Sequence, residues 1–74
     1  MNLLETTEEK TYVLLRTGAD EHFIRRAGSM GLVAGTELRI IRNQAKMPLL
    51  IFARDTLIAV NRKDAAGIEV EAHV

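Results

Sequence analysis

The chain has 74 residues, of which 47% are hydrophobic, ten are basic, ten are acidic and none is cysteine. This length fits one small domain, and the apolar content is too high for a disordered chain. The charge balance argues against a general binder of nucleic acid or anionic membrane, because such binders need a basic excess. Without cysteine there is no disulfide, no thiolate metal site and no cysteine nucleophile.

No segment predicts a membrane span or a secretory signal. The longest apolar run, residues 47–53, is seven residues long, whereas a helix that crosses a bilayer needs about 20. The first five residues contain neither a charged n-region nor a signal-peptide core. We therefore expect a soluble, cytoplasmic protein without membrane insertion.

The charges are distributed unevenly along the chain. Residues 1–24 carry a net charge of −3, residues 25–63 a net charge of +6 and residues 64–74 a net charge of −3. Folding can mix these segments into a mottled surface or gather the basic middle on one face, and the sequence leaves both outcomes open.

The first elements are predicted from short local patterns. Residues 1–9 predict a partly ordered N-terminal extension, followed by a single domain over residues 10–74. Strand-forming residues from Thr11 to Arg16, which end at the turn signal Thr17-Gly18, predict the first strand.

Between Asp20 and Met30 the pattern changes to that of a short helix. Phe23, Ala27 and Met30 fall at positions i, i+4 and i+7 and form one apolar stripe. Asp20 suits the N-cap, because its carboxylate can accept hydrogen bonds from amides of the first turn.

Two glycines bear on the end of this helix. Gly31 suits the left-handed position that follows a helix, which would fold Leu32 back onto Ala27. Gly28 lies inside the last turns, where glycine costs about 1 kcal/mol relative to alanine. It predicts either a close approach of another backbone or an early end of the helix.

The second half of the sequence alternates between apolar and polar residues with a period of two, as strands do. Asn61 is predicted to cap one tight turn, and Pro48 fits only the start or edge of a strand. Further strands are expected at 37–40, 49–53, 56–60 and 68–73, with a loop at 43–46 and a hairpin turn at 54–55. The whole pattern predicts a mostly β protein, a small bent barrel of five strands with one short α-helix after the first strand.

Catalysis has little support in the sequence. Ser29 is the single serine, and no motif places it on a sharp turn. Neither of the glycine-rich phosphate-binding motifs occurs. We therefore predict a protein that is not an enzyme and uses no cofactor.

Metal binding is an alternative that the residues leave open. His22 and His73 lie about fifty residues apart, which matches no compact ligand spacing. The prediction is therefore no metal site, with solvent-facing histidines. The competing hypothesis is a ferrous or other divalent metal-ion-binding protein that uses His22, Asp20 and Glu21.

A small nucleic-acid-binding barrel is a further alternative, which would use the basic middle segment. Arg39 and Arg42 need not share a face, because their separation along a strand is odd. Stacking platforms are few, since Phe52 lies in an apolar run that we expect to be core. We predict no direct contact with nucleic acid.

Protein binding needs no special chemistry, and one segment suits it. Arg25 and Arg26 precede Met30 and Leu32 within a short stretch, and arginine and methionine are enriched at interfaces. The opposite interpretation is that Met30 and Leu32 are buried while both arginines are solvated. The residue types alone do not decide between the two.

The segment from Arg25-Arg26 through Met30-Gly31-Leu32-Val33-Ala34-Gly35-Thr36-Glu37-Leu38 resembles the central signature of FeoA-type ferrous iron transport proteins. The later segments 58–62 and 65–70 agree, so the resemblance covers about residues 11–72. The family commonly has proline where this chain has Ala34, and leucine where it has Ala27.

The resemblance implies an SH3-like barrel and a non-enzymatic cytoplasmic accessory role in ferrous iron uptake. The implied partner is FeoB, a membrane iron transporter, whose cytoplasmic GTP-binding region the protein would dock on and modulate. The same fold occurs in iron-dependent repressors of the diphtheria-toxin-repressor type. A weak homodimer is also allowed, because exposed strand edges can pair between chains. We predict a partner-binding surface at Arg25, Arg26, Met30 and Leu32, with structural turn residues Gly31 and Gly35.

Overall fold

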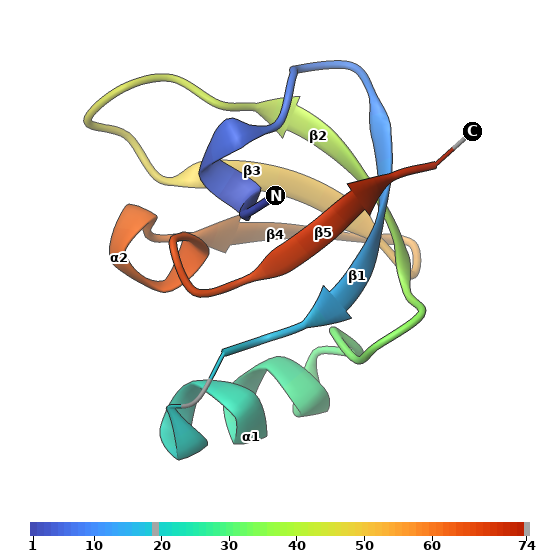
Figure 1. Cartoon of the computed structure of the whole chain (residues 1–74), viewed down its shortest axis with the longest axis vertical. Coiled ribbons are helices and arrows are strands. Elements are labelled where there is room, and N and C mark those ends of the chain that lie inside the picture. Colours follow the sequence, from blue (N-terminus) through green and yellow to red (C-terminus); the bar gives the residue numbers. More distant parts are fainter. Residues whose placement is uncertain (19, 74) are drawn as a thin grey trace.

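Five antiparallel strands form one curved sheet with the spatial order β4-β3-β2-β1-β5 (Figure 1). The computed structural model describes residues 1–18 and 20–73. The strands are β1 (Thr11–Arg16), β2 (Glu37–Arg42), β3 (Leu49–Ala53), β4 (Thr56–Val60) and β5 (Glu69–Ala72). The helices are the 3-10 turn η1 (Leu3–Glu5), α1 (Glu21–Ser29) and the single turn α2 (Arg62–Ala65). The predicted five-stranded, mostly β fold with a short helix after the first strand is confirmed.

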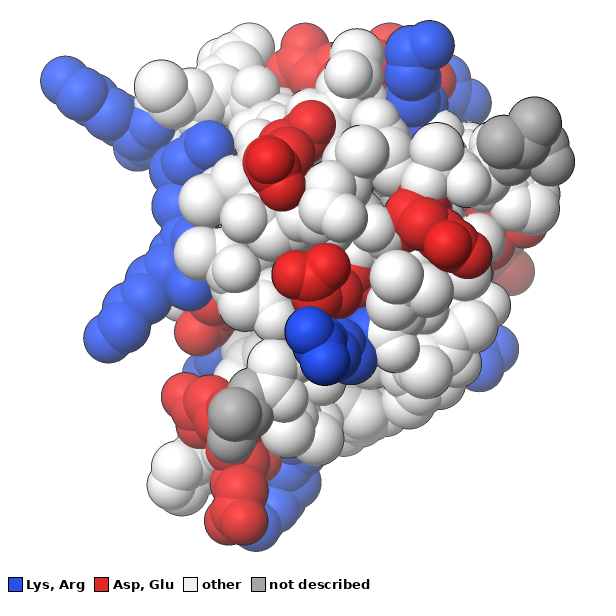
Figure 2. Space-filling model, viewed as in Figure 1, with Lys and Arg blue, Asp and Glu red and all other residues white. Residues whose placement is uncertain are grey.

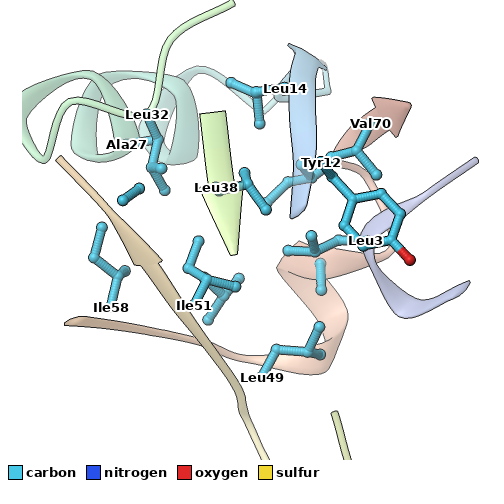
Figure 3. Packing of buried hydrophobic residues seen from close by; sticks show 14 of the residues in the cluster. Leu3, Tyr12, Leu14, Ala27, Leu32, Leu38, Leu49, Ile51, Ile58 and Val70 are labelled. Atoms are coloured by element: carbon cyan, nitrogen blue, oxygen red, sulfur yellow. The ribbon is translucent and has the colours of Figure 1, made fainter. Parts of the chain in front are cut away.

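Alternation along the strands builds the core. On β1 and β2 every second side chain is buried, as in Leu14, Leu38 and Ile40, which are at most 1% exposed. Figure 3 shows Leu14 and Leu38 in one cluster with residues from α1, β3, β4 and β5. Burial of aliphatic side chains is the main force that holds a domain of this size together. No helix among the described residues is long and apolar enough to cross a membrane.

Helix α1 begins and ends as the sequence predicts. Asp20 Oδ1 accepts hydrogen bonds from the backbone amides of His22, at 2.9 Å, and Phe23, at 3.4 Å. At the other end Gly31 has φ of +86°, and the amide of Leu32 donates to the carbonyl of Ala27 at 2.8 Å. This is a Schellman ending, which brings Leu32 back against the helix and into the core.

The prediction for Gly28 is wrong. The helix continues through Ser29, and a Cβ added at Gly28 would meet nothing within 4 Å. The close backbone approach occurs instead at Gly18, which has φ of +88° and where a Cβ would lie 2.8 Å from the carbonyl oxygen of Gly67. Only a residue without a side chain fits this contact between the end of β1 and the start of β5.

The N-terminal residues differ from the expected extension over 1–9, because they pack on the domain. Leu3 is fully buried in the core, and its amide donates to the carbonyl of Ile68 at 2.9 Å. Asn2 forms a bridge with Glu69, and the amide of Val70 donates to the carbonyl of Met1 at 2.8 Å. The first residues thereby cover the start of the outer edge of β5, at Glu69 and Val70. Asn2 and Glu5 also form a capping box around η1.

The expectation that Phe52 is core is wrong. On β3 the inward residues are Leu49, Ile51 and Ala53, so the side chain of Phe52 points outward and is 42% exposed. Its partner across the sheet is Leu57 on β4, which is 57% exposed. A strand can bury only every second residue on one face, and this rule overrides the apolar character of the run.

Candidate functional site

The four residues predicted to bind a partner do not form one surface. Leu32 is 2% exposed and packs in the core, so in the folded chain its side chain is closed to a partner. Met30 is 38% exposed at the C-terminal end of α1. The sequence left open whether these two residues are buried or accessible, and the structure shows that Leu32 is buried and Met30 is accessible.

Arg26 and Met30 share a groove between α1 and β4, which we call the α1–β4 groove. Its lining is Phe23, Arg26, Met30, Ala59, Val60, Asn61 and Asp64, and its volume is about 220 Å³. Ligand pockets are generally larger, from about 300 Å³ upward. A hollow of this size fits one or two protruding side chains better than a whole small molecule.

Arg26 forms one wall of the groove and is held by two contacts. Its Nη2 lies 3.1 Å from Asp64 Oδ2, and its guanidinium carbon lies 5.5 Å from the centroid of the Phe23 ring. Exposed ion pairs and cation–π contacts each contribute at most about 1 kcal/mol. Together they link α1 to α2 and fix the orientation of the Arg26 side chain beside Met30.

Arg25 lies on another side of the same helix. Successive residues of an α-helix are rotated by about 100°, so Arg25 points away from the stripe that contains Phe23 and Met30. It is exposed, and Ser29 donates a hydrogen bond to its backbone carbonyl at 3.0 Å. The structure therefore does not bring Arg25 to the groove.

Gly31 and Gly35 shape the turn that follows the helix. Gly31 has φ of +86° and Gly35 has φ of +91°, a region that suits glycine. The Gly31 carbonyl accepts hydrogen bonds from Thr36 Oγ1, at 3.1 Å, and from Arg54 Nε, at 3.2 Å. The amide of Gly35 donates to the carbonyl of Leu14 at 2.8 Å. These bonds tie the turn to β1 and to the β3–β4 hairpin.

The candidate metal ligands do not converge. His22 is exposed, and one carboxylate oxygen of Asp20 already caps α1. Within residues 1–18 and 20–73, no group of three His, Cys, Asp or Glu side chains could hold an ion. His73 instead lies with its Nε2 3.5 Å from Glu37 Oε2.

The basic middle of the chain is interleaved with the acidic ends. Arg26 pairs with Asp64, and Arg39 Nη2 lies 2.6 Å from Glu9 Oε2. Both signs of charge therefore appear on the face in Figure 2, and basic side chains gather at its left edge, over the β2–β3 loop and α2. The sequence left open whether the basic and acidic segments mix on the surface or the basic residues gather on one face. The structure shows that the charges mix, with one local basic edge.

Arg62 is a structural member of this basic edge. Its Nη1 donates to the carbonyls of Gln44, at 2.9 Å, and Met47, at 3.2 Å, and to Asn43 Oδ1, at 3.2 Å. A single guanidinium thus fastens the β2–β3 loop to α2. No sequence pattern predicted this role, because the loop and α2 are separated by two strands.

The residues of the groove that sequence reasoning missed lie on β4 and α2. Ala59, Val60 and Asp64 are more than 25 residues from α1 along the sequence, and neither their type nor their spacing marks a site. One sequence pattern could have indicated the helix side of the groove. Phe23, Arg26 and Met30 fall at positions i, i+3 and i+7, which places them on adjacent parts of one helix face.

Comparison with known proteins identifies the family. The sequence matches the model of the FeoA domain over residues 1–72. It is 26% identical to a FeoA protein from Chlorobium tepidum, with a TM-score of 0.90, over 100% of this chain and 71% of that chain. It is 25% identical to Stenotrophomonas maltophilia FeoA, solved with zinc, with a TM-score of 0.82, over 96% of this chain and 89% of that one.

The fold is shared more widely than the sequence. A manganese-dependent transcriptional repressor has a TM-score of 0.88 at 16% identity, and this chain covers 41% of it. That likeness shows the fold alone. The comparison with curated proteins gives no match. Because the family model spans residues 1–72 and these FeoA structures match 96–100% of the chain, the chain belongs to the FeoA domain family, whose members are non-catalytic accessory proteins of iron uptake.

Proposed function

We propose that this protein docks on the cytoplasmic GTP-binding region of a FeoB-type membrane iron transporter and modulates ferrous iron uptake. Membership of the FeoA domain family supports the general role. The observation that carries the docking site is the α1–β4 groove, where the accessible Met30 lies beside the oriented guanidinium of Arg26.

The composition of the groove suits a protein partner. Met30 offers accessible apolar surface above the buried Phe23 and Val60, and Arg26 and Asp64 give a charged rim. Interfaces commonly combine an apolar centre with a polar rim, and methionine adapts its shape to a partner side chain. The groove therefore receives an apolar side chain of the transporter, while Arg26 orients the approaching segment.

The test is binding of the purified FeoB cytoplasmic region by the wild-type chain and by variants. Met30→Asp replaces the apolar mouth of the groove with a carboxylate beside Arg26 and should weaken binding at least about tenfold, because it removes an apolar contact and occupies the guanidinium that orients the partner. Met30 is partly exposed, so the variant should remain folded, which circular dichroism verifies.

Arg25→Glu is the matched control, because it changes charge on the same helix but outside the groove. It should bind within about twofold of the wild type. The GTP hydrolysis rate of the FeoB region, measured with and without the wild-type chain, tests modulation separately. Full binding by a folded Met30→Asp chain would reject the groove, and no binding by the wild type would reject the partner.

A further inference from the structure

A second apolar surface lies on the outer face of the sheet, where β3 and β4 pair. The register places Leu50 opposite Ala59 and Phe52 opposite Leu57. Ile51 and Ile58, which alternate with them, are buried, so these four side chains point outward. Phe52 and Leu57 are 42% and 57% exposed, respectively. The four side chains form a block two residues wide and two residues long.

The neighbouring strand borders this block with arginines on one side only. Arg39 lies opposite Phe52, and Arg42 lies opposite Leu50, because the register shifts at the β-bulge of β2. Arg39 is paired with Glu9, whereas Arg42 is exposed and has no ion-pair partner among the described residues. On the other side, β4 carries no charged residue from Thr56 to Val60. We call the block together with Arg39 and Arg42 the β2–β4 face.

A hollow of about 370 Å³ adjoins this face. It is lined by Phe52 and Arg39 together with residues of β1, β2 and the hairpin turn. It therefore offers space for a side chain that packs on the Phe52 ring and approaches the Arg39 guanidinium. Phenylalanine and arginine are both enriched at protein interfaces.

We propose that the β2–β4 face binds an amphipathic helix of a protein partner, whose apolar stripe lies along β3 and whose carboxylates lie over β2. Outward residues of one strand are about 7 Å apart, and apolar residues four positions apart on a helix have a similar spacing. The length of the block thus matches two successive apolar positions of the helix, about one turn apart. Arg42 then pairs with an acidic flank of the helix.

The same observations disfavour two other occupants. An anionic membrane would also meet the carboxylates of Glu37 and Asp55, which lie at the hairpin end of this face and repel it. A second copy stacked on the face in the same orientation would bring its own Arg39 and Arg42 against these arginines, because its acids on this face, Glu37 and Asp55, lie at the hairpin end and not beside Arg42. A helix with acids on one flank satisfies both conditions.

The experiment uses the full chain, labelled with nitrogen-15, and two synthetic helical peptides of about 15 residues, a length at which isolated helices begin to be stable. Both peptides carry one leucine stripe, flanked on one side by glutamate in the first peptide and by lysine in the second. The glutamate peptide should give saturable amide shifts confined to β2, β3 and β4. The lysine peptide should bind at least about tenfold more weakly, which corresponds to about 1.4 kcal/mol.

Two substitutions test the contacts separately. Leu57→Ser should weaken binding of the glutamate peptide at least about tenfold. Leu15→Ser is the control, because this leucine is 44% exposed on β1, outside the face, and it should leave the binding of that peptide unchanged. Arg42→Glu should reverse the preference, so that the lysine peptide binds more tightly than the glutamate peptide. A reversed preference between the two peptides, caused by a single substitution, would not arise from a general loss of structure.

The proposal is overturned if neither peptide binds, if both bind equally, or if the shifts fall on α1 instead. It is also overturned if phosphatidylglycerol vesicles bind the chain and Leu57→Ser abolishes that binding, or if Leu57→Ser abolishes a dimer seen by sedimentation velocity. The two proposed surfaces share Ala59 and are otherwise separate. Since these measurements use no FeoB, their failure would leave the proposed function untouched.

Discussion

Arg54, at the tip of the β3–β4 hairpin, donates a hydrogen bond from Nε to the backbone carbonyl oxygen of Gly31, at 3.2 Å. This bond joins the hairpin to the residue that ends α1, although the two are 23 positions apart in the sequence. The end of the helix is thus held both by its own Schellman bonds and by a side chain from the sheet.

Arg54→Met should therefore lower the free energy of unfolding by about 1 kcal/mol, because it removes the donor and keeps the aliphatic stem. Urea denaturation measures the change. Arg42→Met is the control, since Arg42 is exposed and makes no ion pair among the described residues. Equal losses in the two variants would show that the bond to Gly31 contributes nothing.

Gly18→Ala and Gly35→Ala separate the cost of a left-handed backbone from the cost of a close contact. Both residues have φ near +90°, but only at Gly18 would a Cβ collide with another backbone. Gly35→Ala should lower the free energy of unfolding by about 1 kcal/mol, the usual cost of a side chain at positive φ. Gly18→Ala should cost at least about twice as much in the same denaturation assay. Similar values would mean that the chain adjusts around Gly67.

Gly28→Ala should stabilise the protein. The position is helical and exposed, and a Cβ there would meet nothing within 4 Å, so alanine gains about 1 kcal/mol of helix propensity. In a domain of this size the melting temperature should rise by about 4–8 °C, measured by circular dichroism. An unchanged or lower melting temperature would contradict this prediction and would point to a need for glycine in α1.

Leu32→Ala should lower the free energy of unfolding by about 3 kcal/mol, because Leu32 is buried and its removal leaves a cavity in the core. The adjacent Val33, which is 45% exposed, provides the control, and Val33→Ala should cost less than about 1 kcal/mol. Chemical denaturation of the two variants compares them directly. A small loss for Leu32→Ala would contradict its place in the core.

Leu3→Ala should be as damaging as a substitution in the middle of the sheet, with a loss of about 3 kcal/mol. Leu3 is fully buried, whereas the neighbouring Thr7 is exposed. Thr7→Ala should therefore change the free energy of unfolding by less than about 0.5 kcal/mol. If both variants unfold at the wild-type denaturant concentration, the first residues are not part of the folded domain.

The sequence predicts local features well, because a few neighbouring residues determine them. The helix from Asp20 to Met30, its cap and its glycine ending all follow from contacts within about ten residues, and each agrees with the structure. The hairpin turn at Arg54-Asp55 is likewise local. In contrast, residues 1–9 contain too short an apolar pattern to show that Leu3 enters the core.

Surfaces are harder to predict, because they combine distant segments. The run Leu49–Ala53 has no polar residue to mark its outer side, so the exposure of Phe52 emerges only from its pairing with β2 and β4. The α1–β4 groove joins residues that are more than 25 positions apart. Leu32 and Met30 look alike in sequence, yet the turn at Gly31 places one inside and the other outside.

The packing of the first three residues along β5 also limits how these molecules can associate. The start of one outer strand, β5, is already paired within the same chain, whereas no described strand lies along the outer side of β4. Growth of a fibre by repeated strand addition requires two free edges on every molecule. The pairing of the N-terminal residues with Glu69 and Val70 shortens one of these edges and so works against repeated strand addition.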